Sequence, residues 1–288
     1  MIATPTPDHR TSGEAALRRG LAVLVEKPVA ATLDDARALI AAAEAAALPL
    51  IVGHHRRCHP FVTAARQAVQ ELGELVGLQG MWCLSKHTAY YEPEWRRQAG
   101  AGPLMTNLSH EIDLLHFLIG GISEVTTLTS SARRGLAIED TAAIAFRFEN
   151  GTLGSFLISD AGASPWSFEA ATGENPAIAI SGKDYIRIAG TEGAMEFPSL
   201  TRWGTSAAGE ADWSKPLHCT SGPGLQKVDP LLEQVNRFAA LVTGKDDDVL
   251  CRGAEGIAAL EMTLAAALSG KTGGPVRAGA VPGDYRGT

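Results

Sequence analysis

Lys27 is the first residue whose type and position suit catalysis. It follows an apolar run at residues 21–25 and Glu26, and it precedes Pro28, whose ring fixes the backbone. Partial burial would lower the pKa of the lysine ammonium, whereas the neighbouring Glu26 would raise it. A lysine in this setting can hydrogen-bond a substrate hydroxyl and stabilise the negative charge that develops on its oxygen. The alternative is a surface lysine at the end of a strand.

His110 is the second candidate for catalysis. Thr106, His110 and Asp113 are spaced at i, i+4 and i+7, so we expect them on one helix face. A histidine on a polar stripe is a candidate general acid or base, and a plain helix-surface histidine is the alternative. His110–Glu111 does not belong to a zinc-protease HExxH motif, because the next histidine is His116, six residues on.

A basic cluster follows the third apolar run. Its histidines at positions 54, 55 and 59 have the chemistry of metal ligands, but no carboxylate or cysteine is spaced to complete a site, so no metal is predicted. Arg56 and Arg57 are expected to meet an anion, a carboxylate or a polar substrate, because a guanidinium matches such groups in shape and charge.

Predicted strands and helices alternate in the first fifty positions, and they must position these residues. Apolar runs at residues 1–3, 21–25 and 48–53 are predicted to be strands, the second of them buried on both faces. Helices are expected at residues 12–19 and after Thr32, which has the type of an N-cap. This β-α-β-α-β order implies a parallel sheet with right-handed crossovers.

Polar stretches follow each of the three predicted strands. Because ligands bind beyond the carboxyl ends of parallel strands, residues in these stretches are expected to converge on one site. The stretches are residues 4–9, 26–28 and 54–57.

From residue 58 the pattern changes to long strands with flanking helices. A loop at 87–99 contains Trp95 and Arg96, which are placed to lie over a ligand, although Trp95 would equally suit a core. Asn150–Gly151 predicts a hairpin between two strands. Helices are expected at 60–72, 103–119, 229–243 and 253–269, strands at 75–86, 123–133, 140–149, 152–160, 177–189 and 193–203, and an irregular excursion at 204–228.

Composition narrows the class of protein. The chain has 288 residues and a formal net charge of −7, which argues against nucleic acid or an anionic membrane as the main partner. Its four cysteines show no CxxC spacing, which favours reduced thiols in a cytoplasm. No apolar run is long enough for a membrane span, and the N-terminus does not read as a signal peptide.

Several stretches in the order of the chain resemble one family. Together they resemble the glucose–fructose oxidoreductase / inositol 2-dehydrogenase / rhizopine-catabolism (Gfo/Idh/MocA) family of NAD(P)-dependent oxidoreductases. They are ATPTPDH, VLVEKPVAATLDDARALI, VGHHRRCHP, GPLMTNLSHEIDLL, EDTAAIAFRFENG and GTEGAMEF, spread over residues 3–197.

The resemblance implies a fold of class α/β plus α+β. Residues 1–57 would be the remnant of an NAD(P)-binding Rossmann domain with a partial parallel sheet. Residues 58–288 would form a C-terminal domain for substrate binding and oligomerisation, built on a large, open, mostly antiparallel sheet.

The resemblance also implies roles for individual residues. Lys27 and His110 would be catalytic, with His110 carrying the substrate proton. The cofactor NAD or NADP would be bound by Thr4, Pro5, His9, Glu26, Lys27, Pro28, Trp95 and Arg96. The substrate would be bound by His55, Arg56, Thr106, Asn107 and His110.

Two departures from the family pattern bear on these roles. Many members carry an aspartate four residues before the histidine, where this chain has Thr106. Members also reach the Glu-Lys-Pro motif later in the chain than position 26, after a glycine-rich phosphate loop that is not found here. We therefore expect the natural protein to be longer at its N-terminus.

The implied activity is hydride transfer between a nicotinamide and a sugar, polyol or related hydroxy compound, by a homodimer or homotetramer. The alternatives are a non-catalytic sugar- or cofactor-sensing member, an inactive fragment and, within the enzyme class, a redox-assisted glycosidase.

Overall fold

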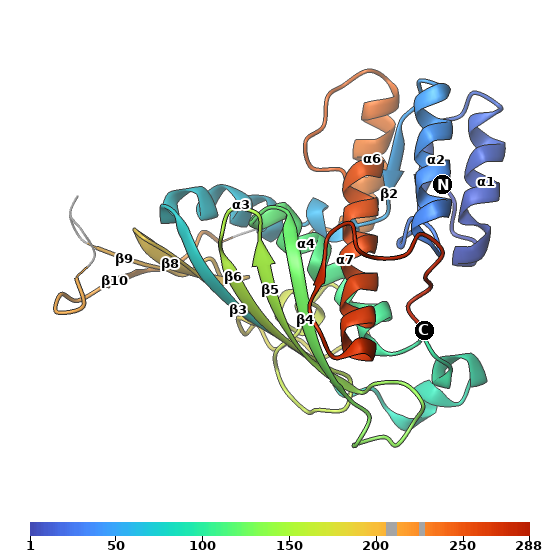
Figure 1. Cartoon of the computed structure of the whole chain (residues 1–288). Coiled ribbons are helices and arrows are strands. Elements are labelled where there is room, and N and C mark those ends of the chain that lie inside the picture. The colour runs from blue at the N-terminus through green and yellow to red at the C-terminus, as the bar shows by residue number, and fades with distance from the viewer. Residues whose placement is uncertain (206–211, 225–227) are drawn as a thin grey trace.

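The N-terminal part is a small parallel sheet with helices beside it (Figure 1). The computed structural model describes residues 1–205, 212–224 and 228–288. Strand β1 (Val23–Val25) pairs in parallel with β2 (Leu50–Val52), and every residue of both strands is buried. The predicted first strand is reduced to one parallel bridge between Ile2 and Val25. The parallel sheet is thus confirmed.

The two N-terminal helices differ in how well their starts were predicted. Helix α2 (Leu33–Ala45) begins after Thr32, whose hydroxyl accepts a hydrogen bond from the Asp35 N–H, as an N-cap does. Helix α1 (His9–Leu17) begins three residues earlier than expected, directly after a 3₁₀ turn at Thr6–Asp8. The earlier start places His9 at the junction with the first polar stretch.

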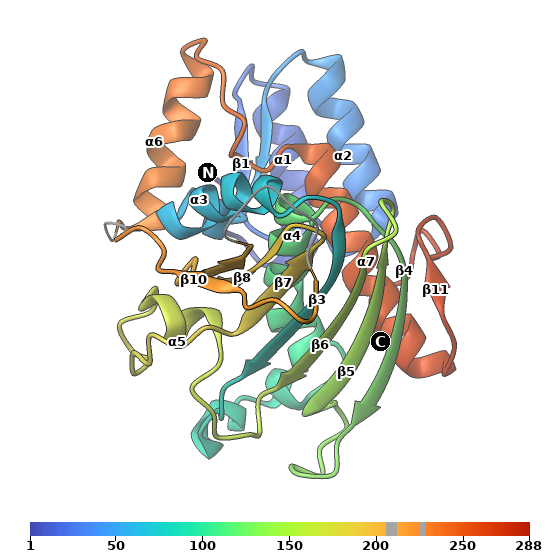
Figure 2. The same ribbon diagram turned by 90° about the vertical axis from the view of Figure 1, so that its left-hand side faces the viewer.

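A nine-stranded sheet dominates the rest of the chain (Figure 2). Its order is β10-β9-β8-β7-β3-β6-β5-β4-β11, and only the β3–β6 pair is parallel, so the expected mostly antiparallel open sheet is confirmed. The strands are β3 Leu75–Cys83, β4 Ile122–Ser130, β5 Thr141–Phe148, β6 Leu153–Ser159, β7 Ile186–Gly190, β8 Gly193–Phe197, β9 Arg202–Gly204, β10 His218–Thr220 and β11 Val276–Arg277.

One face of this sheet carries the core. Along β5, Ala142, Ile144, Phe146 and Phe148 are buried and alternate with exposed residues, because successive side chains of a strand point to opposite faces. Helices α4 (Ser109–Leu118) and α7 (Gly253–Thr272) lie on the buried side, and Figure 2 looks onto the other face.

The last long helix joins the two parts of the chain. The Val52 N–H donates to the Cys251 carbonyl oxygen at 2.8 Å, which extends the small sheet just before α7 starts. A Cβ atom at Gly256 would lie only 2.4 Å from Val52 Cγ2, so α7 packs tightly on β2. The proposed boundary at residue 57 therefore separates segments that remain in contact, and it stays a prediction.

Several predicted segments end differently in the structure. The expected strand at 177–189 begins only at Ile186, and the one at 193–203 is split into β8 and β9. Residues 206–211 and 225–227 of the predicted irregular excursion lie outside the described part.

The remaining elements are α3 Pro60–Val69, α5 Phe168–Thr172, α6 Pro230–Val242, a π-helical turn at Leu104–Leu108 and 3₁₀ turns at His55–Cys58, Gln70–Leu72, Thr88–Tyr91 and Glu94–Arg97. Among the described helices, none combines the length and apolarity that crossing a bilayer requires.

Candidate active site at the end of the parallel sheet

Lys27 leaves the end of β1 and reaches the C-terminal part of the chain. Its Nζ donates a hydrogen bond of 3.2 Å to the carbonyl oxygen of Thr106. Burial, and after it the positive charge of Arg56, lower the pKa of the ammonium to about 8, while Glu26 acts in the opposite direction. No carboxylate oxygen of the described residues lies within 4 Å of this amine. The amine is therefore a charged donor without a direct counter-ion.

His110 lies one turn beyond this contact. The π-helical turn Leu104–Leu108 leads into α4, and His110 is the second residue of that helix. Burial pushes the pKa of the imidazole well below its usual value, and the positive charge of Lys27 pushes it in the same direction. The ring is half-buried, and its Nδ1 is a buried atom without a hydrogen-bond partner. At neutral pH the imidazole is therefore uncharged and able to accept a proton.

Thr106 and Asn107 connect Lys27 to further polar groups. Thr106 Oγ1 lies 2.9 Å from both the Gly102 carbonyl oxygen and Asn107 Oδ1. Asp113, which was expected on the same face, instead binds the Arg57 guanidinium in the interior. The expectation of one shared polar face assumed an α-helix from 103 to 119, whereas a π-helical turn occupies its first part.

The first two polar stretches meet at His9. One ring nitrogen of this buried histidine lies 2.9 Å from the Thr4 carbonyl oxygen, and the other lies 3.0 Å from the Pro28 carbonyl oxygen. Thr4 and Pro5 themselves are exposed. The two ring nitrogens of His9 thus connect the loop after the first bridge to the loop that carries Lys27.

The third polar stretch, residues 54–57, places His55 beside His110. Its Nε2 lies 2.7 Å from Glu174 Oε1, and its ring centre lies 5.7 Å from that of His110. The Nδ1 atom of His55 is buried and, like Nδ1 of His110, has no partner. Two unpartnered ring nitrogens on neighbouring rings are the signature of a place where a ligand or water completes the hydrogen bonding.

Arg56 is surrounded by carboxylates. Its guanidinium is only 4% exposed and lies 2.6 Å from carboxylate oxygens of both Glu111 and Glu169, and 3.5 Å from Glu174. It does meet carboxylates, but they belong to the protein itself. Its two terminal nitrogens therefore donate to carboxylates inside the fold, and a role of Arg56 in substrate binding stays a prediction.

Arg57 and its partners occupy the one described cluster with metal-ligand spacing. Ligand atoms of His54, Asp113 and Cys251 lie within 4.8 Å of one another. However, Arg57 donates to both oxygens of Asp113, at 2.7 and 3.0 Å. Burial also raises the pKa of the Cys251 thiol, which keeps it protonated. We assign no metal to this cluster, because a guanidinium already neutralises its carboxylate.

Trp95 and Arg96 lie in a 3₁₀ turn at Glu94–Arg97. Trp95 is 58% exposed, so it is not a core residue. The Arg96 guanidinium lies 4.1 Å from the Tyr90 ring centre and donates to the Tyr90 carbonyl oxygen. Lys86 Nζ also lies over the Tyr90 ring, at 4.6 Å. This chain of contacts connects the Trp95–Arg96 pair to the polar groups around Asn107.

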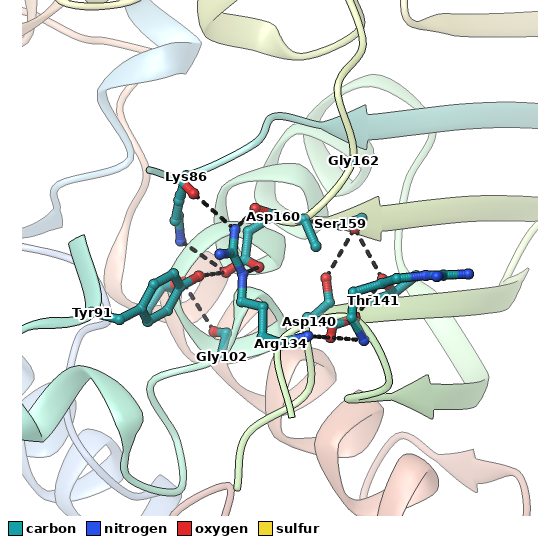
Figure 3. A network of polar contacts seen from close by, with 12 residues as sticks. Lys86, Tyr91, Gly102, Arg134, Asp140, Thr141, Ser159, Asp160 and Gly162 are labelled. Atoms are coloured by element: carbon teal, nitrogen blue, oxygen red, sulfur yellow. Dashed lines mark hydrogen bonds and ion pairs between the residues drawn. The ribbon is translucent and has the colours of Figure 1, made fainter. Parts of the chain in front are cut away.

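Lys86 contacts Asn107 of the candidate site and was not among the residues predicted from the sequence. Its Nζ donates to Asn107 Oδ1 at 3.0 Å and lies 3.6 Å from Asp160. Figure 3 shows Lys86, Tyr91 and Arg134 gathered around the Asp160 carboxylate. The available signal was its place at the end of the strand predicted at 75–86, before an aromatic loop, but nothing local distinguished it from a surface lysine.

Comparison with known proteins agrees with this architecture. Residues 1–54 match the family model described as "Oxidoreductase family, NAD-binding Rossmann fold". Residues 62–196 match the model described as "GFO/IDH/MocA C-terminal domain". Together the two models cover most of the chain.

The chain is similar to curated dehydrogenases and reductases of sugars. It is 32% identical over 155 residues to the D-apiose dehydrogenase of Paraburkholderia graminis, covering 52% of this chain and 40% of that protein. It is 32% identical over 165 residues to the 1,5-anhydro-D-fructose reductase of Ensifer adhaerens, covering 54% of this chain and 48% of that one. The matched region thus spans less than half the length of each of these relatives.

Solved structures share the fold along almost the whole chain. The WlbA dehydrogenase from Bordetella pertussis, in complex with NADH and UDP-GlcNAcA, gives a TM-score of 0.69 at 23% identity, covering 97% of this chain and 78% of that one. An oxidoreductase from Agrobacterium radiobacter, in complex with NAD⁺, L-tartaric acid and magnesium, gives 0.74 at 19% identity, with 97% and 79% covered. With both domain models matched and the fold shared, the chain belongs to the Gfo/Idh/MocA family of NAD(P)-binding oxidoreductases.

Proposed function

We propose that this protein transfers hydride between the nicotinamide of NAD or NADP and a CH–OH group of a sugar, polyol or related hydroxy compound. The observation that carries this proposal is the approach of Lys27 to the turn before His110. A charged amine donates to the Thr106 carbonyl oxygen, and the same charge lowers the pKa of the His110 imidazole. A donor for an oxygen and an acceptor for a proton are the two groups that oxidation of an alcohol requires.

The roles of the two side chains follow from their protonation. Lys27 hydrogen-bonds the substrate oxygen and stabilises the negative charge that it gains as its proton leaves. His110 receives that proton, because its imidazole is neutral at pH 7. In the direction of reduction the same groups act in reverse. Bound nicotinamide supplies or accepts the hydride, which is chemistry that no side chain provides.

The groups around Lys27 fit the nicotinamide end of such a cofactor. His9 fixes the Thr4 and Pro28 loops to one another, and the exposed Thr4 and Pro5 leave that edge open to a ligand. The unpartnered Nδ1 atoms of His55 and His110 leave hydrogen-bonding capacity for a substrate. Glu26, Trp95 and Arg96 complete the proposed cofactor set. The choice between NAD and NADP is left to experiment.

The open face of the large sheet supports assembly as a homodimer or homotetramer. Val76, Leu128 and Leu153 are 61%, 71% and 51% exposed on their strands. Burial of large, exposed apolar side chains of a sheet against another surface is favourable. Light scattering on the purified chain tests this, and a monomer at micromolar concentration would contradict it.

The proposed activity is tested by cofactor titration followed by turnover. NADH and NADPH are titrated into the chain by fluorescence, and reduction of NAD(P)⁺ is then followed with a panel of sugars, polyols and inositols. We expect micromolar binding, and a loss of at least about a hundredfold in kcat for Lys27→Ala and for His110→Ala. The exposed Lys183→Ala is the matched control and keeps wild-type turnover.

The outcomes separate the alternatives. Wild-type turnover in the Lys27→Ala or His110→Ala variant would refute the assigned roles. Tight cofactor binding without turnover on any compound of the panel would favour a sensing protein.

A further inference from the structure

We infer that a small cavity between the loop after β2, helix α4 and helix α7 binds one buried water molecule, which is held by His54 and Ser109. This inference goes beyond the proposed function and does not depend on it, because it involves neither cofactor nor substrate. It is carried by two buried polar side chains that line one cavity and have atoms without a hydrogen-bond partner in the described part of the chain.

The cavity lies where the two parts of the chain meet. The residues that line it include Pro28 after β1, His54 after β2, Ser109 at the start of α4, and Gly256 and Thr263 of α7. The centre of a water molecule can occupy about 10 Å³ of the cavity, which is room for one water and too little for an organic ligand. Two of its wall residues are the chain neighbours of Lys27 and His110.

His54 is the first of the two groups. It is 3% exposed, and its ring makes no hydrogen bond to a described residue, with Nδ1 buried and unpartnered. Nδ1 lies 3.7 Å from Asp113 Oδ2, which is too long for a hydrogen bond. Arg57 donates to both oxygens of Asp113 and so holds that carboxylate in place. Where no protein group can serve a buried polar atom, an ordered water is its usual partner.

Ser109 is the second group. It is 4% exposed, and its Oγ is buried without a partner, although a hydroxyl can both donate and accept. Thr263 adds a third polar atom, because its Oγ1 donates to the Ala259 carbonyl oxygen at 2.7 Å and keeps lone pairs that can accept. Three polar groups match the roughly three hydrogen bonds that a buried water makes.

The chemistry of the wall favours a neutral ligand over an ion. Burial lowers the pKa of His54 to about 4, so at neutral pH its ring offers one N–H donor and one nitrogen acceptor. The other residues that line the cavity have no ionisable side chain. An ion of either sign would therefore lack a direct counter-ion in the cavity, whereas water both donates and accepts.

The first test is a crystal structure of the 288-residue chain at a resolution that shows ordered water. We expect density for one water molecule about 2.6–3.2 Å from a His54 ring nitrogen and from Ser109 Oγ. The absence of density between these two groups overturns the inference. A His54 or Ser109 side chain turned to bond a protein group there, with no water, overturns it as well.

The second test removes the Ser109 hydroxyl and measures stability by chemical denaturation. If the hydroxyl binds the water, Ser109→Ala should raise the ratio of unfolded to folded chain about fivefold, because the water loses a partner. If the hydroxyl has no partner, its removal relieves a buried unsatisfied group, and the ratio should stay the same or fall.

Ser12→Ala is the matched control for this variant. Ser12 also lies in a helix, α1, but it is half-buried and its hydroxyl makes no hydrogen bond to a described residue. We expect the ratio of unfolded to folded chain to change less than about twofold in this control. An unchanged or lower ratio in Ser109→Ala, relative to Ser12→Ala, overturns the inference. That result leaves the proposed hydride transfer intact, because the Lys27 and His110 variants test it separately.

Discussion

The amine of Lys27 donates a hydrogen bond of 3.2 Å to the carbonyl oxygen of Thr106, 79 residues away in the sequence. One residue belongs to the end of the parallel sheet, and the other to the turn that carries the chain into α4. This contact fixes the amine beside the helix of His110. The proposed chemistry therefore depends on how the two parts of the chain pack, more than on either motif alone.

The buried ion pairs of Arg56 should be essential for stability. Arg56→Met would leave Glu111 and Glu169 without their cation, and an unpaired buried charge costs about 3–5 kcal/mol. The matched control is Arg187→Met, which breaks the exposed pair with Glu196 and should cost less than about 1 kcal/mol. Chemical denaturation measures both. Equal effects of the two variants would show that the buried cluster adds no special stability.

Stability should fall as the pH drops from 6.5 to 4. Burial lowers the pKa of His54 and of His116 to about 4, so the unfolded chain binds protons in this window and the folded chain does not. Burial raises the pKa of Glu111 to about 7, which acts in the opposite direction, because the folded chain then holds the proton that the unfolded chain loses. Burial lowers the pKa of His110 as well, so three histidines act against Glu111 and the net loss is at least about 3 kcal/mol.

Variants test the sign of these two contributions. His116→Gln should reduce the loss of stability between pH 6.5 and 4, since one proton uptake is removed. Glu111→Gln should make the loss steeper. Denaturation midpoints measured across the range decide this, and a flat profile in the wild type would contradict the assignment of buried neutral histidines.

The packing of α7 on β2 should tolerate no side chain at Gly256. A Cβ there would lie 2.4 Å from Val52 Cγ2, and Val52 is fully buried. Gly256→Leu should therefore destabilise the fold by about 1–3 kcal/mol or more. Gly274→Leu is the control, because a Cβ at Gly274 meets nothing within 4 Å. Thermal unfolding that is the same in both variants would show that the contact is not tight.

Local patterns in the sequence were enough for much of the fold. Thr32 and Asp35 give the N-cap of α2, and Asn150–Gly151 gives the hairpin between β5 and β6, because each depends on a few adjacent residues. The strand predicted at 140–149 likewise corresponds to β5. These signals are local, so a single sequence contains them in full.

The partners of the site residues were not predictable in the same way. Arg56 meets Glu111 and Glu169, which lie 55 and 113 positions away, and nothing near Arg56 indicates that its charge is used inside the fold. Lys86 donates to Asn107, which lies 21 positions away, and nothing near Lys86 indicates that contact either. The π-helical turn also escaped prediction, since periodicity at 103–119 fits an ordinary helix.

The central claim is that the charge of Lys27 and the imidazole of His110 share one site. NMR titration of the His110 ring in the 288-residue chain tests it directly, with His110→Gln used to assign the signal. Because the ammonium lowers the pKa of the imidazole, Lys27→Met should raise the pKa of His110, whereas Lys183→Met should leave it unchanged. The same His110 pKa in wild type and Lys27→Met would contradict the account.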